Sequence, residues 1–208
     1  MTEIRNGKKV LITPITEEDV RALHIGDTIY IDGHVVTGRD AVHDRVVVEG
    51  LDMPVDIHGG VDVHAGPIVR DLGDGHFEMV AIGPTTSMRM EHFEYDFIKK
   101  TGVRILVGKG GMKDNTAAGC KEFGAVHCVF PAGNAIVAAV CIEEIESAHW
   151  LDLGMPEAVY DCRVKEFGPL IVGIDTEGRN FFEEKKVEYE KIKDEEVAKI
   201  SAEVGYIM

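Results

Sequence analysis

The sequence predicts an α/β fold with mixed sheets, formed by one domain over residues 1–208. Three observations support this prediction. Segments typical of strands are repeatedly followed by segments typical of helices, the alternation expected of α/β domains. An Asp-Gly pair between two apolar runs indicates antiparallel pairing as well. Finally, 208 residues with 45% hydrophobic content are enough to bury one compact core.

The first elements follow from capping and turn signals. A short apolar run at Lys9–Thr13 predicts a strand, and Thr16 with Asp19 three residues later resembles a capping box at the start of a helix. Thr28–Ile31 and His34–Thr37 flank Asp32-Gly33, which predicts a β-hairpin. Apolar residues then recur at helical spacing from Arg39 to Val48, before Gly50.

The glycine-rich middle of the chain repeats a unit of strand, turn and helix. Glycine after a helical pattern is typical of helix ends, and short apolar runs are typical of buried strands. We therefore expect strands at Phe77–Ile82, Val103–Val107 and Ala125–Phe130, a helix at Met88–Lys100 closed by Gly102, and a helix at Lys113–Phe123 ended by Gly124.

The last third predicts two strands and a charged helix. Tyr160–Phe167 and Leu170–Asp175 read as strands separated by Gly168-Pro169. From about Phe182 the chain is dominated by Glu and Lys with sparse apolar residues, which indicates an amphipathic helix with a solvated charged face.

The charge balance limits the classes of partner. Lys and Arg number 22 against 37 Asp and Glu, a net charge of −15, which opposes binding to nucleic acid or to an anionic membrane. No apolar run approaches the roughly 18 to 20 residues that span a bilayer, so we expect a cytoplasmic protein. A small anionic substrate stays possible if cations are gathered locally.

Cysteine and histidine spacing gives little support for a metal site. Cys120, Cys128, Cys141 and Cys162 lack the short paired spacings of zinc or iron–sulfur ligands, and we expect them to be reduced and mostly buried. His58 and His64 with Asp62 would share one strand face, so a zinc site is an alternative. Zinc needs three or four ligands, and the prediction is that this chain holds no metal.

Gly83-Pro-Thr-Thr-Ser-Met-Arg-Met90 lies between a predicted strand and a predicted helix. Free amides at a helix start favour a carboxylate or phosphate, the hydroxyls of Thr85 and Thr86 add donors, and Arg89 adds a guanidinium. The simpler alternative is that Thr86 or Ser87 only caps the helix.

Two further cations stand at predicted element ends. Lys109 lies between Gly108 and Gly110 after a strand, where small neighbours leave room for it to reach a crevice. Arg39 begins a helix, where the helix dipole disfavours a cation, and His43 follows one turn later on the same face. An anionic ligand would explain Arg39, although an exposed lysine in a plain turn and an ordinary surface arginine are the alternatives.

Taken in order, several motifs resemble the β-type region of class I fumarases and L-tartrate dehydratases, from near Lys8 to near Arg179. The run Gly83-Pro-Thr-Thr-Ser-Met-Arg-Met90 is the most distinctive, and the others mean little individually. They are Gly38-Arg-Asp-Ala-Val-His43, His64-Ala-Gly-Pro67, Gly108-Lys-Gly110, Leu153-Gly-Met155 and Val164-Lys-Glu-Phe167.

The resemblance implies a fold and a partner. The β region of this family is similar to the swivelling β/β/α domain of aconitase-like enzymes, so one such domain with a charged helix from about residue 182 is expected. The family's other region carries three cysteines that hold a 4Fe-4S cluster. This chain resembles only the β region, so we expect a separate cluster-binding α subunit, a hetero-oligomer, and no cluster on this chain.

The resemblance also implies a reaction, the reversible hydration of fumarate to malate. Arg39, Arg89 and Lys109 would bind the substrate carboxylates together with Thr85 and Thr86. Thr85, Arg89 and Lys109 would be catalytic, with Thr85 as the proton-abstracting base. L-tartrate dehydration is the first alternative, because the same cations would bind tartrate. A non-catalytic anion-binding or assembly module is the alternative from another class.

Overall fold

The computed structural model describes residues 1–131, 133 and 135–204 and has a mixed α/β fold. The α/β prediction with sheets of mixed orientation is confirmed. The strands are β1 (Thr2–Arg5), β2 (Lys8–Ile12), β3 (Thr28–Thr37), β4 (Val61–Val63), β5 (Ile68–Gly73), β6 (His76–Ala81), β7 (Ile105–Gly108), β8 (Val126–Val129), β9 (Ile142–His149) and β10 (Val159–Ile174). The helices are α1 (Glu17–Arg21), α2 (Asp40–Val47), α3 (Glu94–Thr101), α4 (Asp114–Phe123), α5 (Ala135–Val140) and α6 (Phe181–Glu203).

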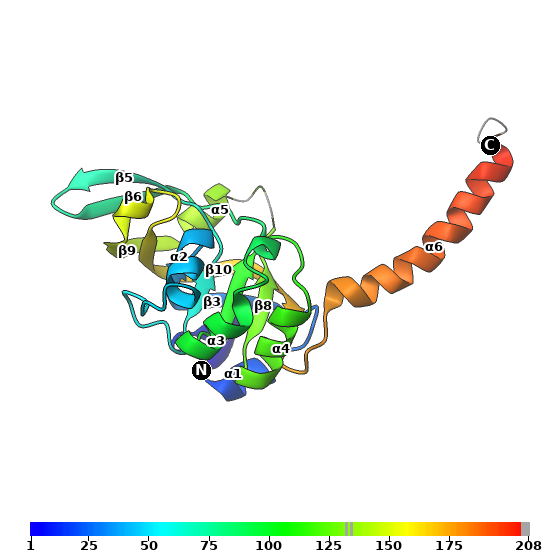
Figure 1. Cartoon of the computed structure of the whole chain (residues 1–208), viewed down its shortest axis with the longest axis horizontal. Helices are drawn as coiled ribbons and strands as arrows, with labels where there is room; N and C mark the ends of the chain where they lie inside the picture. Colours follow the sequence, from blue (N-terminus) through cyan, green and yellow to red (C-terminus); the bar gives the residue numbers. More distant parts are fainter. Residues whose placement is uncertain (132, 134, 205–208) are drawn as a thin grey trace.

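Eight strands form the main sheet in the order β1-β2-β3-β4-β7-β8-β10-β9. The strands from β2 to β8 in this order are parallel to their neighbours. Strand β10 pairs antiparallel with β8 and also with β3, so β3, β4, β7, β8 and β10 form a closed circuit of pairings. Strands β5 and β6 form a separate hairpin that projects from the body (Figure 1).

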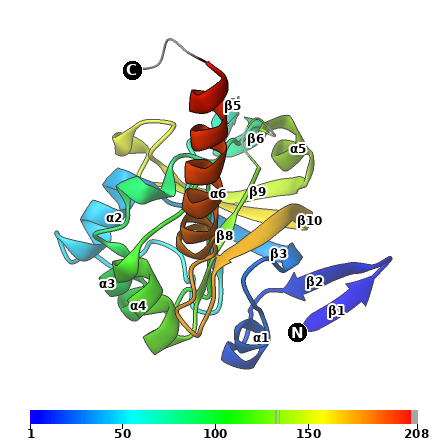
Figure 2. The ribbon, with the colours of Figure 1, turned by 90° about the vertical axis from the view of Figure 1, so that its right-hand side faces the viewer.

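Apolar side chains pack on both sides of the main sheet. Helices α2, α3 and α4 lie together on one side (Figure 2), where Val42, Phe97 and Cys120 join the smaller core. The larger core contains Val20 of α1 and Ala138 of α5 with residues from most strands. Side chains alternate across a strand, so neighbouring positions of β4 and β8 face opposite cores. That alternation puts Asp62 and His127 on the side of α2 and α3.

The hairpin predicted around Asp32-Gly33 is wrong, because β3 runs through it without turning back. Gly33 has φ +103 and only bends the strand. The Asp32 carboxylate accepts from Arg5 Nη1 at 2.8 Å, Lys165 Nζ at 2.5 Å and the Glu166 amide at 2.7 Å. Long-range ion pairs therefore hold this Asp-Gly pair inside a sheet, where local turn preference does not decide the conformation.

Two other predicted boundaries differ from the structure. The strands predicted on either side of Gly168-Pro169 are one strand, β10, whose register shifts near that point. The helix predicted at Met88–Lys100 divides into a 3₁₀ turn at Ser87–Arg89 and helix α3, which ends at Gly102 in the left-handed conformation as predicted. Strands β1, β5 and β9 and helix α5 were not predicted from the sequence.

The other predicted elements appear within a few residues of the predicted bounds. The capping box is present, because Thr16 Oγ accepts from the Asp19 amide and the Asp19 carboxylate accepts from the Thr16 amide. Helix α4 ends at Gly124, and α6 begins one residue before the predicted Phe182.

Helix α6 projects away from the rest of the molecule (Figure 1). Its start is fixed by Asn180, whose side chain accepts from the amides of Phe182 and Glu183. Beyond the first turn its apolar side chains, such as Val187 and Ile192, are about half exposed. Among the described residues, no helix has the length and apolarity needed to cross a membrane.

Candidate substrate-binding site

The predicted site residues follow the ends of neighbouring parallel strands. Arg39 follows β3, His64 follows β4 and Lys109 follows β7, and these strands are adjacent in the sheet. Since the carboxyl ends of parallel strands lie at the same edge, residues that are distant in sequence come together there. Ligands of α/β proteins commonly bind at this edge, so it is the candidate site.

The loop carrying Thr85 and Thr86 is attached to this edge by backbone hydrogen bonds. The Thr85 amide donates to the carbonyl oxygen of His64 at 2.6 Å, and the Lys109 amide donates to that of Thr85 at 2.9 Å. The Ser87 amide donates to the Lys109 carbonyl at 3.1 Å. The structure therefore brings the predicted residues Thr85, Thr86 and Lys109 next to one another.

The long helix predicted to start at this loop is wrong, but anion binding by the loop stays a prediction. The amides of Thr85 and Ser87 already have carbonyl partners, and Ser87 starts a 3₁₀ turn while α3 begins only at Glu94. The alternative that Thr86 or Ser87 caps the helix is also wrong, since Thr86 makes no capping bond and the hydroxyl of Ser87 contacts His64.

Arg39 and Arg89 both lie at this edge, each paired with a carboxylate of the chain. Arg39 Nη2 lies 2.9 Å from Glu157 Oε1, and Arg39 Nη1 donates to the Pro156 carbonyl at 3.3 Å. Arg89 binds the Asp40 carboxylate through both Nε and Nη2, with Nε 2.9 Å from Oδ1. Asp40 directly follows Arg39, so the two arginines are linked through neighbouring residues.

Arg89 also reaches the hydroxyl of Thr85. Its Nη1 lies 3.5 Å from Thr85 Oγ, a long contact that points the guanidinium toward the hydroxyl. Arg89 is about half exposed and Arg39 is mostly covered, with 48% and 18% of their side chains accessible. A ligand could therefore reach Arg89 more directly than Arg39.

Lys109 is half-buried, and no ion pair joins it to any residue that the structure describes. Gly108 before it is required by packing, because a Cβ there would lie 1.9 Å from Ser87 Oγ and 3.1 Å from the Cβ of His64. A Cβ at Gly66 would lie 2.2 Å from Arg39 Nη1 and 3.1 Å from the Pro156 carbonyl oxygen, so a larger residue there would displace the Arg39 guanidinium. These two glycines of the sequence motifs therefore allow close packing of Ser87, His64 and the Arg39 guanidinium at the candidate site.

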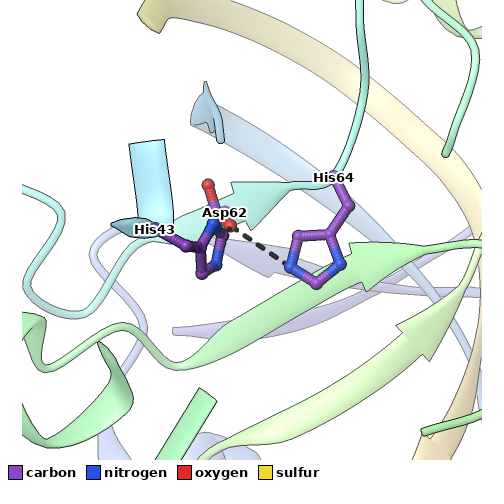
Figure 3. Close-up of side chains that lie close together, drawn as sticks. All are labelled: His43, Asp62 and His64. Carbon is purple, nitrogen blue, oxygen red and sulfur yellow. Dashed lines mark ion pairs between the residues drawn. The ribbon is translucent and has the colours of Figure 1, made fainter. Parts of the chain in front are cut away.

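Beneath this edge lie four completely buried ionisable residues, His43, Asp62, His64 and Glu94, here called the buried quartet. Three of them are drawn in Figure 3. His64 Nε2 lies 3.4 Å from Asp62 Oδ2 and 3.1 Å from Glu94 Oε1. His43 Nε2 lies 3.6 Å and 3.4 Å from the same two oxygen atoms. Each imidazole thus faces both carboxylates.

The charges of the quartet shift its pKa values strongly. Burial lowers the pKa of His64, but Glu94 and Asp62 outweigh burial and raise it to about 10. The same carboxylates raise the pKa of His43. Burial raises the pKa of Glu94, yet the two histidines lower it to about 2. By contrast, burial and the charge of His64 lower the pKa of the neighbouring His127 to about 3.

Three members of the quartet form one of two groups of side chains, among the described residues, that are close enough together to bind a metal ion. Ligand atoms of His43, Asp62 and His64 lie within 4.8 Å of one another, as do those of the more exposed His34, Glu146 and Asp161. The alternative pairing of His58 with His64 is wrong, because His58 is exposed and its ring lies against Gly102. That the chain holds no metal stays a prediction.

The four cysteines do not fit an iron–sulfur cluster. All are free thiols; Cys120, Cys128 and Cys162 are buried and Cys141 is partly covered. Burial raises the pKa of Cys128 and Cys120, and it raises that of Cys162 to about 12. A cluster needs thiolates gathered at one point. Among the described residues, no cysteine joins a group of candidate metal ligands.

Sequence reasoning missed several residues of this region. Glu157 and Asp40 were not predicted as partners of the arginines, because their pairing depends on the fold. Glu94 gave one usable signal, a carboxylate inside an apolar helical pattern between Phe93 and Phe97. His43 was placed correctly on the helix face of Arg39, and its Nδ1 lies 2.9 Å from the Arg39 carbonyl oxygen.

Comparison with known proteins adds an independent result. The model of the family described as "Fumarase C-terminus" matches residues 2–185. The L(+)-tartrate dehydratase subunit beta of Escherichia coli (strain K12) is 52% identical over 200 residues, which cover 96% of this chain and 99% of that protein. A Geobacillus stearothermophilus protein named "Putative fumarate hydratase class I" is 41% identical over 174 residues, which cover 84% of this chain and 33% of that protein.

Proposed function

From the premise that this chain belongs to the fumarase C-terminus family, we propose that it is the β subunit of an iron–sulfur hydro-lyase. Its relatives are subunits or parts of tartrate dehydratases and fumarate hydratases, which are hydro-lyases. The observation that carries the proposal is the 52% identity to a tartrate dehydratase β subunit over nearly the whole of both chains. The candidate site supports it with three cations at one edge of the sheet.

The proposed reaction is the reversible hydration of fumarate to malate. Dehydration of L(+)-tartrate is the second candidate, and the name of the 52% identical relative favours it. Both substrates are four-carbon dicarboxylates, so the same cations serve either reaction. The proposed role of this chain, to bind the substrate carboxylates, is therefore the same for fumarate and for tartrate.

The proposed roles follow from the positions of the side chains. Arg39 and Arg89 bind the substrate carboxylates, each exchanging its present partner, Glu157 or Asp40, for the ligand. Lys109 and Arg89 stabilise the negative charge that builds up on a carboxylate when the neighbouring C–H proton leaves. Thr85 Oγ takes that proton, with Thr86 as a further polar contact. Arg89, whose Nη1 contacts the Thr85 hydroxyl, and Lys109, whose backbone bonds that of Thr85, would favour an ionised Thr85 hydroxyl.

The 4Fe-4S cluster of this enzyme type belongs, in this proposal, to a separate α subunit. The thiols of the described chain do not fit a cluster, which supports that placement. The Geobacillus relative supports it too, because this chain corresponds to only 33% of that longer protein. We therefore propose a cytoplasmic hetero-oligomer of α and β chains that binds neither nucleic acid nor membrane.

We further propose that the whole chain is one domain of the aconitase-like swivelling type. The closed circuit of strands and the three helices on one side support this, and α6 follows the domain as a charged extension. A swivelling domain would carry Arg39, Arg89 and Lys109 as one rigid group toward the α subunit. Its function would then depend on docking against that partner.

The test is to co-express this chain with its cluster-binding partner, purify the complex without oxygen, and measure fumarate absorbance and L-tartrate dehydration. Fumarate turnover that needs both chains is the expected result. Tartrate turnover alone would keep the hydro-lyase and change its substrate. A complex with an intact cluster that acts on neither would refute the proposal and favour the non-catalytic anion-binding module.

A further inference from the structure

The buried quartet is connected to all three segments of the candidate site. His43 lies against the backbone of Arg39, with Nδ1 2.9 Å from the carbonyl oxygen. The carbonyl oxygen of His64 accepts from the Thr85 amide, and His64 Nδ1 lies 3.0 Å from Ser87 Oγ. Gly108, which precedes Lys109, packs directly on His64. The quartet is therefore the common floor beneath the substrate-binding loops.

Hydrogen-bond chemistry fixes the proton positions on His43. A carbonyl oxygen only accepts, so Nδ1 of His43 must carry the hydrogen that it donates to Arg39. A neutral ring would then turn the lone pair of Nε2 toward the carboxylates of Asp62 and Glu94, which is repulsive. An imidazolium, with a hydrogen on both nitrogens, removes this conflict.

His64 stands in the same relation to the two carboxylates. Its Nε2 lies between Asp62 and Glu94 at 3.4 Å and 3.1 Å, so it also needs a hydrogen there. Its Nδ1 lies 3.0 Å from Ser87 Oγ, which can accept, and the raised pKa of His64 favours a hydrogen on both nitrogens. Two imidazolium rings and two carboxylates then sum to zero charge. Such a balanced group can stay buried, whereas removing one member leaves an unpaired charge in the core.

Resting on the function proposed above, we propose that His43 and His64 are positioning residues for the hydro-lyase reaction, held by Asp62 and Glu94 in a charge-balanced quartet. The His64 ring holds Ser87, two residues after Thr85 in the same loop, and the His43 ring holds the backbone of Arg39. Neither histidine touches substrate, because both are completely buried. The two histidines therefore have separable effects, one on the proton transfer and one on substrate binding.

The test compares His64→Gln and His43→Gln in the reconstituted αβ complex. A small displacement of a catalytic group can lower the rate about 100-fold, so His64→Gln should lower kcat by about that factor with KM within about threefold. His43→Gln should instead raise KM about tenfold, through Arg39. Full kcat in a folded His64→Gln complex would refute the proposal.

Charge balance is tested by the double variant His64→Gln with Glu94→Gln. It leaves one imidazolium and one carboxylate, so its kcat should exceed that of His64→Gln alone. Simple additivity of the two losses would overturn the idea of a balanced quartet. The matched control is His127→Gln, which removes another buried histidine on β8 that has no polar contact with the loop. It should leave kcat and KM within about twofold.

Two measurements separate this proposal from the proposed function. Succinate has no double bond and no hydroxyl, so calorimetry of succinate binding needs no turnover. The His43→Gln complex should bind it about tenfold more weakly, even if the true reaction differs from the one proposed. Equal succinate affinity in the unaltered complex and the His43→Gln complex would refute the role of His43.

Metal analysis is the second measurement. One non-iron metal per β chain that is absent from His64→Gln would overturn the proposed charge balance, since a metal rather than protons would then neutralise the carboxylates of the quartet.

Discussion

Thr85 is positioned entirely by its neighbours' backbones. Its amide and its carbonyl oxygen bond to His64 and Lys109, so only its hydroxyl is free to act. The conversion of a threonine hydroxyl into a base needs nearby positive charge, because the hydroxyl is a very weak acid. The structure places the Arg89 guanidinium beside this hydroxyl and the backbone of Lys109 against the backbone of Thr85.

Removing the Thr85 hydroxyl should therefore stop the reaction. Thr85→Val keeps the shape of the side chain and should lower kcat at least about 1,000-fold, at the scale of losing a catalytic base. Thr85→Ser keeps a hydroxyl and should retain activity within about tenfold. Initial rates of both complexes check this. Substantial turnover by Thr85→Val would assign proton abstraction to another group.

Lys109 should matter through its charge. Lys109→Ala should lower kcat/KM at least about 100-fold, because a preorganised cation beside the developing negative charge is lost. Lys113→Ala, which removes an exposed lysine at the start of α4, is the matched control and should change kcat/KM less than about twofold. Equal effects of the two variants would mean that the charge acts only at long range.

The sequence predicted which residues would form the site better than it predicted their partners. Arg39, Thr85, Arg89 and Lys109 were predicted from glycines, element ends and the family resemblance, and the structure brings them to one edge of the sheet, while their binding of substrate stays a prediction. Glu157 and Asp62 could not be placed, because their contacts join segments far apart in the sequence. The predicted helix start at the Thr85 loop was wrong, because residues that follow β4 and β7 bond the amides of Thr85 and Ser87.

At the scale of elements, β3 shows why local signals mislead. Asp-Gly favours a hairpin, yet β3 pairs with β2 over its first half and with β4 over its second half. Strand β10 spans both halves and supplies Lys165 to Asp32. The capping signals at Thr16 and Gly124 were confirmed, because they depend on neighbours within four residues.

Asp32 should therefore contribute measurably to the stability of the sheet. Burial raises its pKa, but hydrogen bonds from Lys165 and Arg5 outweigh burial and lower the pKa to about 2. In the unfolded chain the pKa of an aspartate is near 3.9, so the lower pKa in the fold corresponds to a stabilisation of about 2 kcal/mol above pH 4. This stabilisation is lost as the pH falls through about 2, where the folded carboxylate takes up its proton.

Urea unfolding of Asp32→Asn measures this contribution. The variant should be less stable than the natural chain by about 2 kcal/mol at pH 7, and the difference should shrink between pH 4 and pH 2. Asp71→Asn, an exposed carboxylate on β5, is the control and should change little. A difference that stays constant over this range would refute the ionic origin of the effect.

At the scale of the whole molecule, α6 is distinct from the body. Phe182 packs against Gly111, and Arg179 binds Glu184 at 2.8 Å, so the first turn is anchored. Farther along, the ion pairs Lys185–Glu188 and Lys199–Glu196 join residues of the helix itself. The family match also ends at residue 185.

A chain that ends after Lys186 should therefore keep the stability of the body. We expect its Tm within about 3 °C of that of the full chain, because a change below 1 kcal/mol shifts Tm by only a few degrees at this size. Phe182→Ala, which removes the anchor, should lower Tm more. Thermal melts followed by circular dichroism check both, and loss of cooperative unfolding on truncation would show that α6 belongs to the core.

The pairing of Arg39 with Glu157 and of Arg89 with Asp40 has a consequence for selectivity. Without ligand, the carboxylates of Glu157 and Asp40 occupy the two guanidinium groups, as the two carboxylates of a dicarboxylic acid would. Ligand entry is then a substitution, and its free energy is the difference between two similar sets of ion pairs. A diacid can replace both internal groups together, whereas a monoacid replaces one and meets the repulsion of the other. The protein would thus select dicarboxylic over monocarboxylic acids at the binding step, before the reaction.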